Sequence, residues 1–123
     1  MSYRLSALLI LFLLSACSKP LPTLEGIDLD KWKDDKNGCL GIRQSMEEAI
    51  QREHSKLKGL SEMDIIEMLG RPDQNELYKR NQKFFYYYIR PGNMCSNPEP
   101  TFVRLEIRFN AMGYAQLVAV TDV

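Results

Sequence analysis

The sequence has few of the residues that most often carry out chemistry. It contains one histidine, His54, in no context that resembles a nucleophile with its base or a zinc site with three or four ligands. Sixteen acidic residues are present, but no spacing marks two of them as a catalytic pair. The sequence therefore predicts a protein that is not an enzyme and holds no metal and no cofactor, with His54 as a partly buried packing residue.

Neither sign of charge prevails. Sixteen lysines and arginines balance sixteen aspartates and glutamates, and the two signs are interspersed along the chain. Proteins that bind nucleic acid usually carry a basic patch or stripe. We therefore expect no nucleic acid among the partners.

Apolar runs are too short to span a bilayer as a helix, which takes about 20 residues. The run from Leu5 to Leu14, interrupted only by Ser6, follows the basic residue Arg4. This order of charge and apolar run is typical of a secretory signal peptide.

The signal ends in Leu-Ser-Ala-Cys at positions 14–17, which resembles a bacterial lipobox. We expect cleavage of residues 1–16 and attachment of two or three acyl chains to Cys17, enough for durable anchoring. The alternative is an ordinary signal peptide with a cysteine there by chance. Because Ser18 is not the aspartate that retains such proteins at the inner membrane of enteric bacteria, the expected location is the outer membrane, facing the periplasm.

Cleavage leaves 107 residues, a length that normally makes one compact domain. Residues 17–27 contain Pro20, Pro22 and Gly26 and few apolar residues, which predicts an extended, mobile, lipidated tether. Residues 28–123 then form the single domain.

Three cysteines are present, and lipidation of Cys17 leaves Cys39 and Cys95. An even remainder in an oxidising compartment predicts one disulfide. It closes a loop of about 57 residues. The chain-entropy model predicts that such a disulfide stabilises the folded protein by roughly 4 kcal/mol. The alternative is a pair of free thiols.

Residues 28–39 are strongly charged around Trp32, the single tryptophan, and Asn37-Gly38 marks a turn. Acids recur there, but the spacing lacks the alternating oxygen ligands and final glutamate of a calcium loop. We interpret the stretch as a solvated charged segment. Trp32 either packs as a buried anchor or lies exposed for a partner or lipid headgroups, and we favour core packing.

Two helices are predicted next. Ser45-Met46-Glu47-Glu48 is a capping box, and the apolar positions that follow at helical spacing end at Gly59. Ser61 starts a second helix, which Gly70 and Pro72 end. The two form a helical hairpin with a short joint.

Strands follow. Leu77 and Tyr78 lie in a short strand, the range 84–90 is dense in aromatic residues that favour strands, and 114–120 returns after a turn at Gly113. The range 103–109 alternates apolar and charged residues, typical of a sheet with one buried and one wet face. The predicted fold is α+β, with two helices packed on one face of a small antiparallel sheet.

Four motifs follow one another along the chain: Gly59-Leu60-Ser61, the helix end Ile65–Pro72, the aromatic strand Tyr86–Arg90, and Leu105–Phe109 with Gly113. This ordered set resembles the SmpA/OmlA family, the small BamE-type lipoproteins of outer-membrane β-barrel assembly. The resemblance covers about residues 59–120. The segment from Trp32 to Cys39 and its disulfide depart from the family pattern.

The resemblance implies a helical hairpin on a three- to four-stranded sheet, and a non-catalytic accessory scaffold of β-barrel protein assembly or envelope integrity. The implied partners are envelope proteins of that assembly machinery and anionic lipid headgroups. Tyr86 and Arg90 match the region that makes those contacts in the family, and an arginine fork suits phosphate. Replacing Arg90 with alanine is then expected to weaken binding and leave thermal stability nearly unchanged.

Two other interpretations stay open. The same scaffold serves equally well as a lipid-anchored inhibitor or protein-binding module, since fold alone does not separate these functions. The aromatic run also has a purely structural interpretation, because at least one of its two faces must lie in the core.

Overall fold

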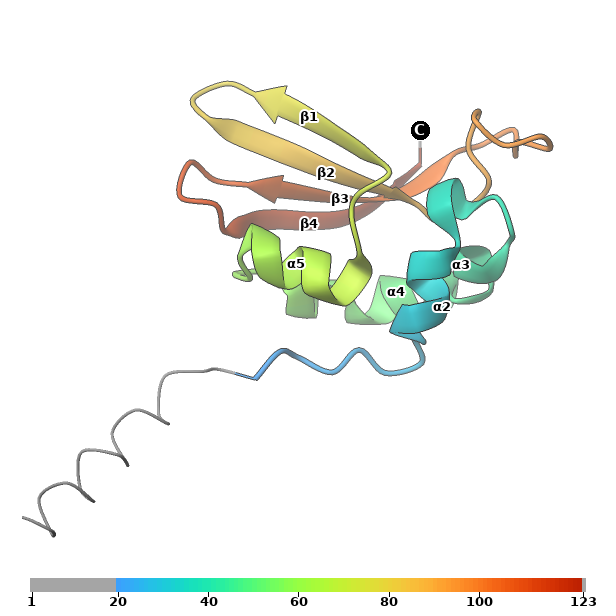
Figure 1. Ribbon diagram of the computed structural model, residues 1–123, viewed down its shortest axis with the longest axis horizontal. Coiled ribbons are helices and arrows are strands. Elements are labelled where there is room, and N and C mark those ends of the chain that lie inside the picture. Colours follow the sequence, from blue (N-terminus) through green and yellow to red (C-terminus); the bar gives the residue numbers. More distant parts are fainter. Residues whose placement is uncertain (1–19, 123) are drawn as a thin grey trace, which may run out of the picture.

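The computed structural model describes residues 20–122, which fold as an α+β domain with a helical layer against a four-stranded sheet (Figure 1). The helical elements are α2 (Leu29–Asp34), η1 (Lys36–Gly38), α3 (Ile42–Ser45), α4 (Glu47–Glu53), η2 (His54–Leu57) and α5 (Glu62–Leu69). The strands are β1 (Gln74–Tyr78), β2 (Gln82–Tyr88), β3 (Val103–Phe109) and β4 (Ala115–Asp122). The predicted α+β class is confirmed; the predicted signal peptide and Cys17 lie outside the described residues.

The helical layer is more broken than the predicted hairpin. Its second predicted helix is α5, which begins where Ser61 accepts a hydrogen bond from the Asp64 amide at 3.2 Å and ends at Gly70. The predicted capping box is wrong, because Ser45 ends α3 and its hydroxyl donates to the carbonyl of Ile42. Two short helices, α2 and α3, precede α4 and were not predicted.

The sheet is an antiparallel meander in the order β1-β2-β3-β4. Arg80 and Asn81, with φ of 58° and 60°, form the tight turn between β1 and β2. β3 alternates buried and half-buried residues, as its sequence predicts, whereas all five residues of β1 are exposed. β1 is therefore an open edge of the sheet.

The core lies between the sheet and the helices. Phe85, Tyr87 and Ile89 face the helical layer, and the buried residues of β3 lie beside them. Trp32 has no exposed surface, and its ring centroid lies 6.3 Å from that of Tyr87. The prediction that Trp32 packs in the core is confirmed.

The segment before α2 also belongs to the packed domain. It has no regular secondary structure, yet Leu24 and Ile27 are buried in the core. Arg52 donates to the carbonyl of Glu25, and Lys56 donates to that of Thr23. The predicted start of the domain at residue 28 is thus a few residues late, because apolar side chains spaced too irregularly to form a pattern still fill the core.

Candidate binding surface

The sheet has one face that the helical layer does not cover (Figure 1). Cross-strand pairing places there a set of mostly aromatic, charged and polar side chains, which we call the outer face. Its members are Gln74, Glu76, Tyr78, Gln82, Phe84, Tyr86, Tyr88, Arg104, Glu106, Arg108, Leu117, Ala119 and Thr121.

Aromatic rings form a continuous row across the outer face. The ring centroids of Tyr78 and Phe84 are 5.4 Å apart with an edge-to-face geometry, and Phe84 stacks on Tyr86 at 5.7 Å. The guanidinium of Arg104 lies over the Tyr86 ring, 4.0 Å from its centroid. Such pairs hold rings in place without a covering layer, so the row is a preformed surface.

Tyr86, a predicted contact residue, lies in the middle of this row. Its hydroxyl donates to Oε2 of Glu76 at 2.8 Å, and 6% of the residue is exposed. Burial, with the neighbouring Glu76 carboxylate, raises the pKa of Tyr86 to about 12. Tyr86 thus supports the more exposed Tyr78 and Phe84 and offers little surface of its own.

Arg108 is a cation on this face without an ion-pair partner among the described residues, and its Nε atom is buried without a hydrogen bond. It lies opposite Phe84 on one side and Leu117 on the other. By contrast, Arg104 binds the carboxylate of Glu106 at 2.8 Å. A guanidinium between apolar side chains suits a carboxylate or other acidic group on a partner.

The other end of the outer face is covered. Phe102 packs edge to face on Tyr88, with 6.3 Å between ring centroids. A Cβ at Gly92 would lie 3.2 Å from the Tyr88 ring. The loop between β2 and β3 therefore closes over Tyr88 and leaves the half around Phe84 and Arg108 accessible.

Arg90, the second predicted contact residue, lies elsewhere. Its guanidinium donates from Nε and Nη2 to both carboxylate oxygens of Glu47 on α4, at 2.7 and 2.9 Å. This hydrogen-bonded pairing raises the pKa of Arg90. The structure thus holds Arg90 against the helical layer and Tyr86 on the outer face, and the bidentate fork expected for phosphate is already occupied.

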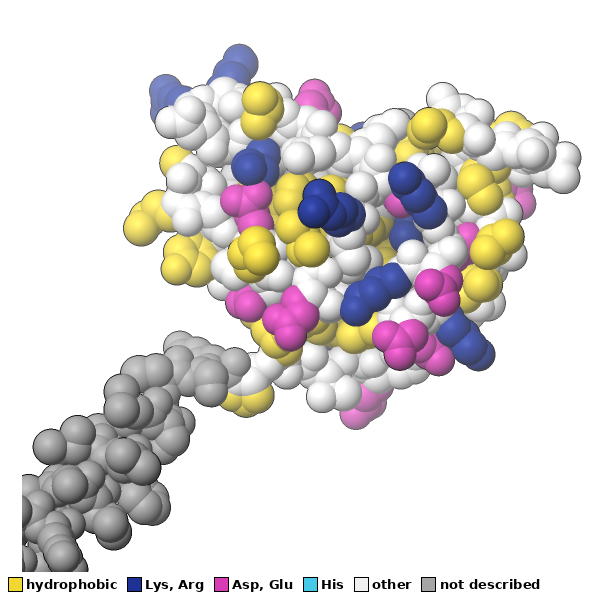
Figure 2. Space-filling model, in the orientation of Figure 1, with side chains coloured by type: hydrophobic (Ala, Val, Ile, Leu, Met, Phe, Trp, Pro, Cys, Tyr) yellow, Lys and Arg dark blue, Asp and Glu magenta, His cyan; other side chains and the backbone are white. Residues whose placement is uncertain are grey.

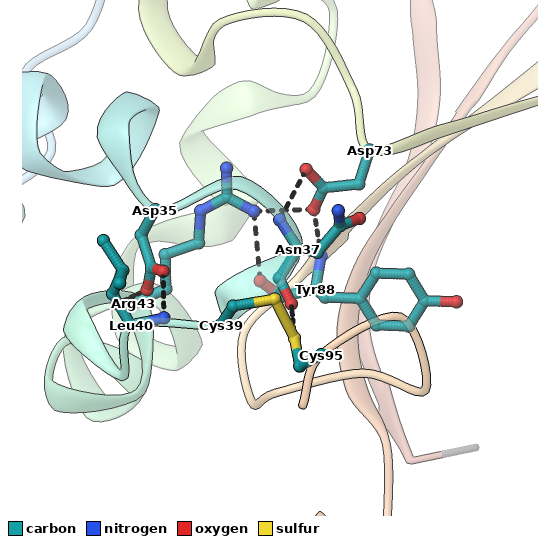
Figure 3. The surroundings of a disulfide bond; sticks show 8 residues. All are labelled: Asp35, Asn37, Cys39, Leu40, Arg43, Asp73, Tyr88 and Cys95. Atoms are coloured by element: carbon teal, nitrogen blue, oxygen red, sulfur yellow. Dashed lines mark hydrogen bonds and ion pairs between the residues drawn. A yellow bond between two sulfur atoms is a disulfide. The ribbon is translucent and has the colours of Figure 1, made fainter. Parts of the chain in front are cut away.

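A buried ion pair that the sequence analysis missed joins the two layers (Figure 3). Nη1 of Arg43 lies 2.6 Å from Oδ2 of Asp73, with both side chains at most 2% exposed. Arg43 also donates to the carbonyls of Trp32 and Tyr88, and its backbone amide donates to Asp35. No local pattern marks this set, because Asp73 is 30 residues from Arg43.

The predicted disulfide between Cys39 and Cys95 lies next to this ion pair (Figure 3). It ties the turn after η1 to the loop between β2 and β3, with 5.3 Å between the two Cα atoms. The Gly92 amide donates to the Asn37 carbonyl across the same contact. The bond therefore holds the loop that covers Tyr88.

The remaining chemistry of the described residues is sparse. His54 Nδ1 lies 2.8 Å from the carbonyl of Gln51, so it donates within its own helical turn. Among residues 20–122 no three His, Cys, Asp or Glu side chains lie close enough to hold a metal ion. No helix in that range is long and apolar enough to cross a membrane.

No family model, no curated protein and no solved structure matches this chain. The resemblance to the SmpA/OmlA family therefore stays a prediction.

Proposed function

We propose that this chain is a non-catalytic lipoprotein of the bacterial cell envelope, an accessory scaffold of outer-membrane β-barrel protein assembly or envelope integrity. What supports the location is the lipobox-like sequence that ends at Cys17. The ordered motifs between Gly59 and Val120 support the link to β-barrel assembly. Its partner is an envelope protein that binds the accessible half of the outer face.

The observation that carries the binding role is the uncovered half of the sheet. Tyr78 is 46% exposed and Leu117 is 38% exposed, and both belong to the same face as Arg108. Protein interfaces are enriched in aromatic residues and arginine, and tyrosine and arginine are common among the residues that contribute most to binding. The aromatic rings and the arginine of the outer face therefore favour a protein-binding surface over a sheet face that is covered only by water.

Site-specific photo-crosslinking in the lipidated full-length protein tests the proposal. A crosslinker replaces Leu117 on the outer face, and a matched variant carries it at Gln51, which is exposed on α4. We expect Leu117 to crosslink to a protein of the β-barrel assembly machinery in native membranes, and Gln51 not to.

Two other results point elsewhere. Capture of one stoichiometric soluble protein at Leu117, without the assembly machinery, would favour the inhibitor or protein-binding alternative on the same face. Equal crosslinking from Gln51 and Leu117 would remove the outer face from the binding role.

A further inference from the structure

The Cys39–Cys95 disulfide lies at the surface of the domain, outside its core. Cys39 is exposed and Cys95 is half-buried, and neither belongs to the cluster of buried core residues. Sγ of Cys95 lies 3.5 Å from the carbonyl oxygen of Asn37. Cys39 is therefore the half of the bond that a nucleophile reaches more easily. Exposed disulfides are more often the labile, regulatory ones than buried disulfides are.

Two long apolar side chains flank the bond. Leu40, next to Cys39, is 70% exposed, and Met94, next to Cys95, is 68% exposed. The Cα atoms of the two cysteines are 5.3 Å apart, so Leu40 and Met94 belong to the same small area of surface. Exposed apolar side chains that lie together mark a contact site more often than single ones do. We call Cys39, Leu40, Met94 and Cys95 the disulfide rim.

The chain on both sides of the bond is uncharged. Residues 37–42 and 91–98 contain no lysine, arginine, aspartate or glutamate. Figure 2 shows mostly hydrophobic and uncharged surface over the β2–β3 loop, which Figure 1 draws in orange at the upper right. Burying a charge against a partner is costly unless the charge is paired. An apolar partner surface therefore docks here without that cost from either segment.

The β2–β3 loop depends on this bond for its position. Among residues 91–102 only Gly92 is buried, so the loop places no large side chain in the core. Besides the disulfide, the Gly92 amide donates to the carbonyl of Asn37 at 3.4 Å, and Phe102 packs on the ring of Tyr88. One long hydrogen bond and one ring pair are weak restraints compared with a covalent bond.

We propose that the Cys39–Cys95 bond is a site of thiol–disulfide exchange with a dithiol oxidoreductase, which docks on the disulfide rim and, by reducing the bond, releases the β2–β3 loop from Tyr88. The exchange needs only the exposed bond, and its consequence for partner binding rests on the proposed function of the outer face. With the loop released, Tyr88 extends the aromatic row beyond Tyr86, because alternate residues of a strand share a face.

The exchange proceeds in two steps. A thiolate of the oxidoreductase attacks Sγ of Cys39, forms a mixed disulfide with it and displaces Cys95 as a thiolate, which takes a proton from water. The second thiolate of the oxidoreductase then attacks its own sulfur in the mixed disulfide and displaces Cys39, which is protonated in turn. Two electrons pass to this chain: the dithiol of the oxidoreductase becomes a disulfide, and the disulfide of this chain becomes two thiols.

Trapping the mixed disulfide identifies the attacked sulfur. The probe is a thioredoxin-fold dithiol protein whose second active-site cysteine is replaced by alanine, so the reaction stops after the first step. It is mixed with the oxidised full-length protein, and peptide mass mapping locates the new bond. We expect the adduct at Cys39. An adduct at Cys95 alone, or no adduct in a protein that dithiothreitol reduces, would overturn the proposal.

Added charges on the disulfide rim separate docking from simple access. Leu40→Glu with Met94→Glu should slow reduction by the intact dithiol protein about tenfold or more, because two apolar contacts are lost. The rate with dithiothreitol in high salt should change less than about twofold, since salt screens the added charges from a small thiolate. Equal slowing with both reagents, or no slowing with the dithiol protein, would overturn the docking.

A matched control adds the same charge elsewhere. Met63 is 73% exposed on α5, and Met112 is 82% exposed in the turn between β3 and β4. Both elements lie toward the other end of the sheet from the β2–β3 loop in Figure 1. Met63→Glu with Met112→Glu should leave both reduction rates unchanged. Slowing by this control as large as that by the rim variant would mean that net charge, and not docking, sets the rate.

Hydrogen exchange tests the release of the loop. The amides of Gly92, Cys95 and Glu99 donate hydrogen bonds in the oxidised protein, so they report on the order of the loop. They should exchange faster after reduction, while the amides of β3 stay protected. Unchanged exchange in the loop would overturn the release. So would exchange that rises equally throughout β3, because the bond would then hold the whole fold and not the loop.

The crosslinker at Leu117 distinguishes failure of this inference from failure of the proposed function. With Cys39→Ser and Cys95→Ser, the loop is released, and capture of the envelope partner should rise about twofold or more as another tyrosine joins the surface. Equal capture by both forms would overturn the regulation and leave the proposed function intact. No capture by either form would refute the proposed function, whereas trapping and reduction rates in the purified protein still decide the exchange site.

Discussion

Arg43 is the residue on which contacts between the helices and the sheet converge. Its guanidinium binds Asp73 before β1 and the carbonyl of Tyr88 in β2, and lies 4.8 Å from the centre of the Trp32 ring. A buried pair of this kind adds little net stability compared with an apolar pair, but removal of one partner leaves a charge buried alone.

Replacing Arg43 with methionine should therefore lower the free energy of unfolding by about 3–5 kcal/mol. Urea denaturation measures it, with Arg52→Met as the control, since the Arg52 side chain is 60% exposed. A loss below about 1 kcal/mol would show that Asp73 finds other partners or becomes neutral.

Tyr86 makes stability depend on pH in the alkaline range. Its pKa is about 12 in the folded protein, above the ordinary tyrosine value of 10.0, so the unfolded chain loses this proton first. The free energy of unfolding should therefore fall as pH rises from 10 toward 12. Tyr86→Phe should make the fall shallower, which urea midpoints at several alkaline pH values would detect; identical slopes would contradict it.

At the scale of elements, the β2–β3 loop and the turn after η1 act as one unit. Gly38 adopts φ of 68°, and a Cβ there would meet the carbonyl oxygens of Tyr88 and Arg90 at 3.0 Å. Glycine thus lets the turn approach the end of β2. The Cys39–Cys95 disulfide holds the far side of the same contact.

Replacing both cysteines with serine should lower the free energy of unfolding by roughly 4 kcal/mol, because the unfolded chain regains the conformational freedom of a long loop. Denaturation of the oxidised protein against the double variant measures this. Reduction of the unchanged protein is the matched control and should approach the same value. A double variant as stable as the oxidised protein would mean that packing alone holds the loop.

At the scale of the whole molecule, one sheet face is buried and the other is partly open. The helical layer, Trp32 and the segment before α2 all pack on the inner face. The accessible half of the outer face is left as a surface for partners.

A chain that begins at Asp28 should be less stable than one that begins at Pro20. It lacks Leu24 and Ile27, and full burial of such side chains contributes about 1.5–3 kcal/mol each. We expect the free energy of unfolding, measured by thermal or urea denaturation, to be about 3–6 kcal/mol lower for the shorter chain. Equal stability of the two chains would mean that residues 20–27 are a tether after all.

Local sequence patterns determined much of this fold. The cap at Ser61, the stop at Gly70 and the alternation along 103–109 predicted α5 and β3, because those elements depend on residues at most a few positions apart. The cysteine count likewise predicted the Cys39–Cys95 bond.

Tertiary structure alone decided which charges are buried and which apolar groups are exposed. Arg43 and Asp73 meet across 30 residues, and Glu47 meets Arg90 across 43, distances at which sequence patterns carry no information. Leu77 belongs to a strand by its sequence, but its exposure follows from the position of β1 at the sheet edge. The partners of a side chain are set by how layers pack, and packing is a property of the folded chain.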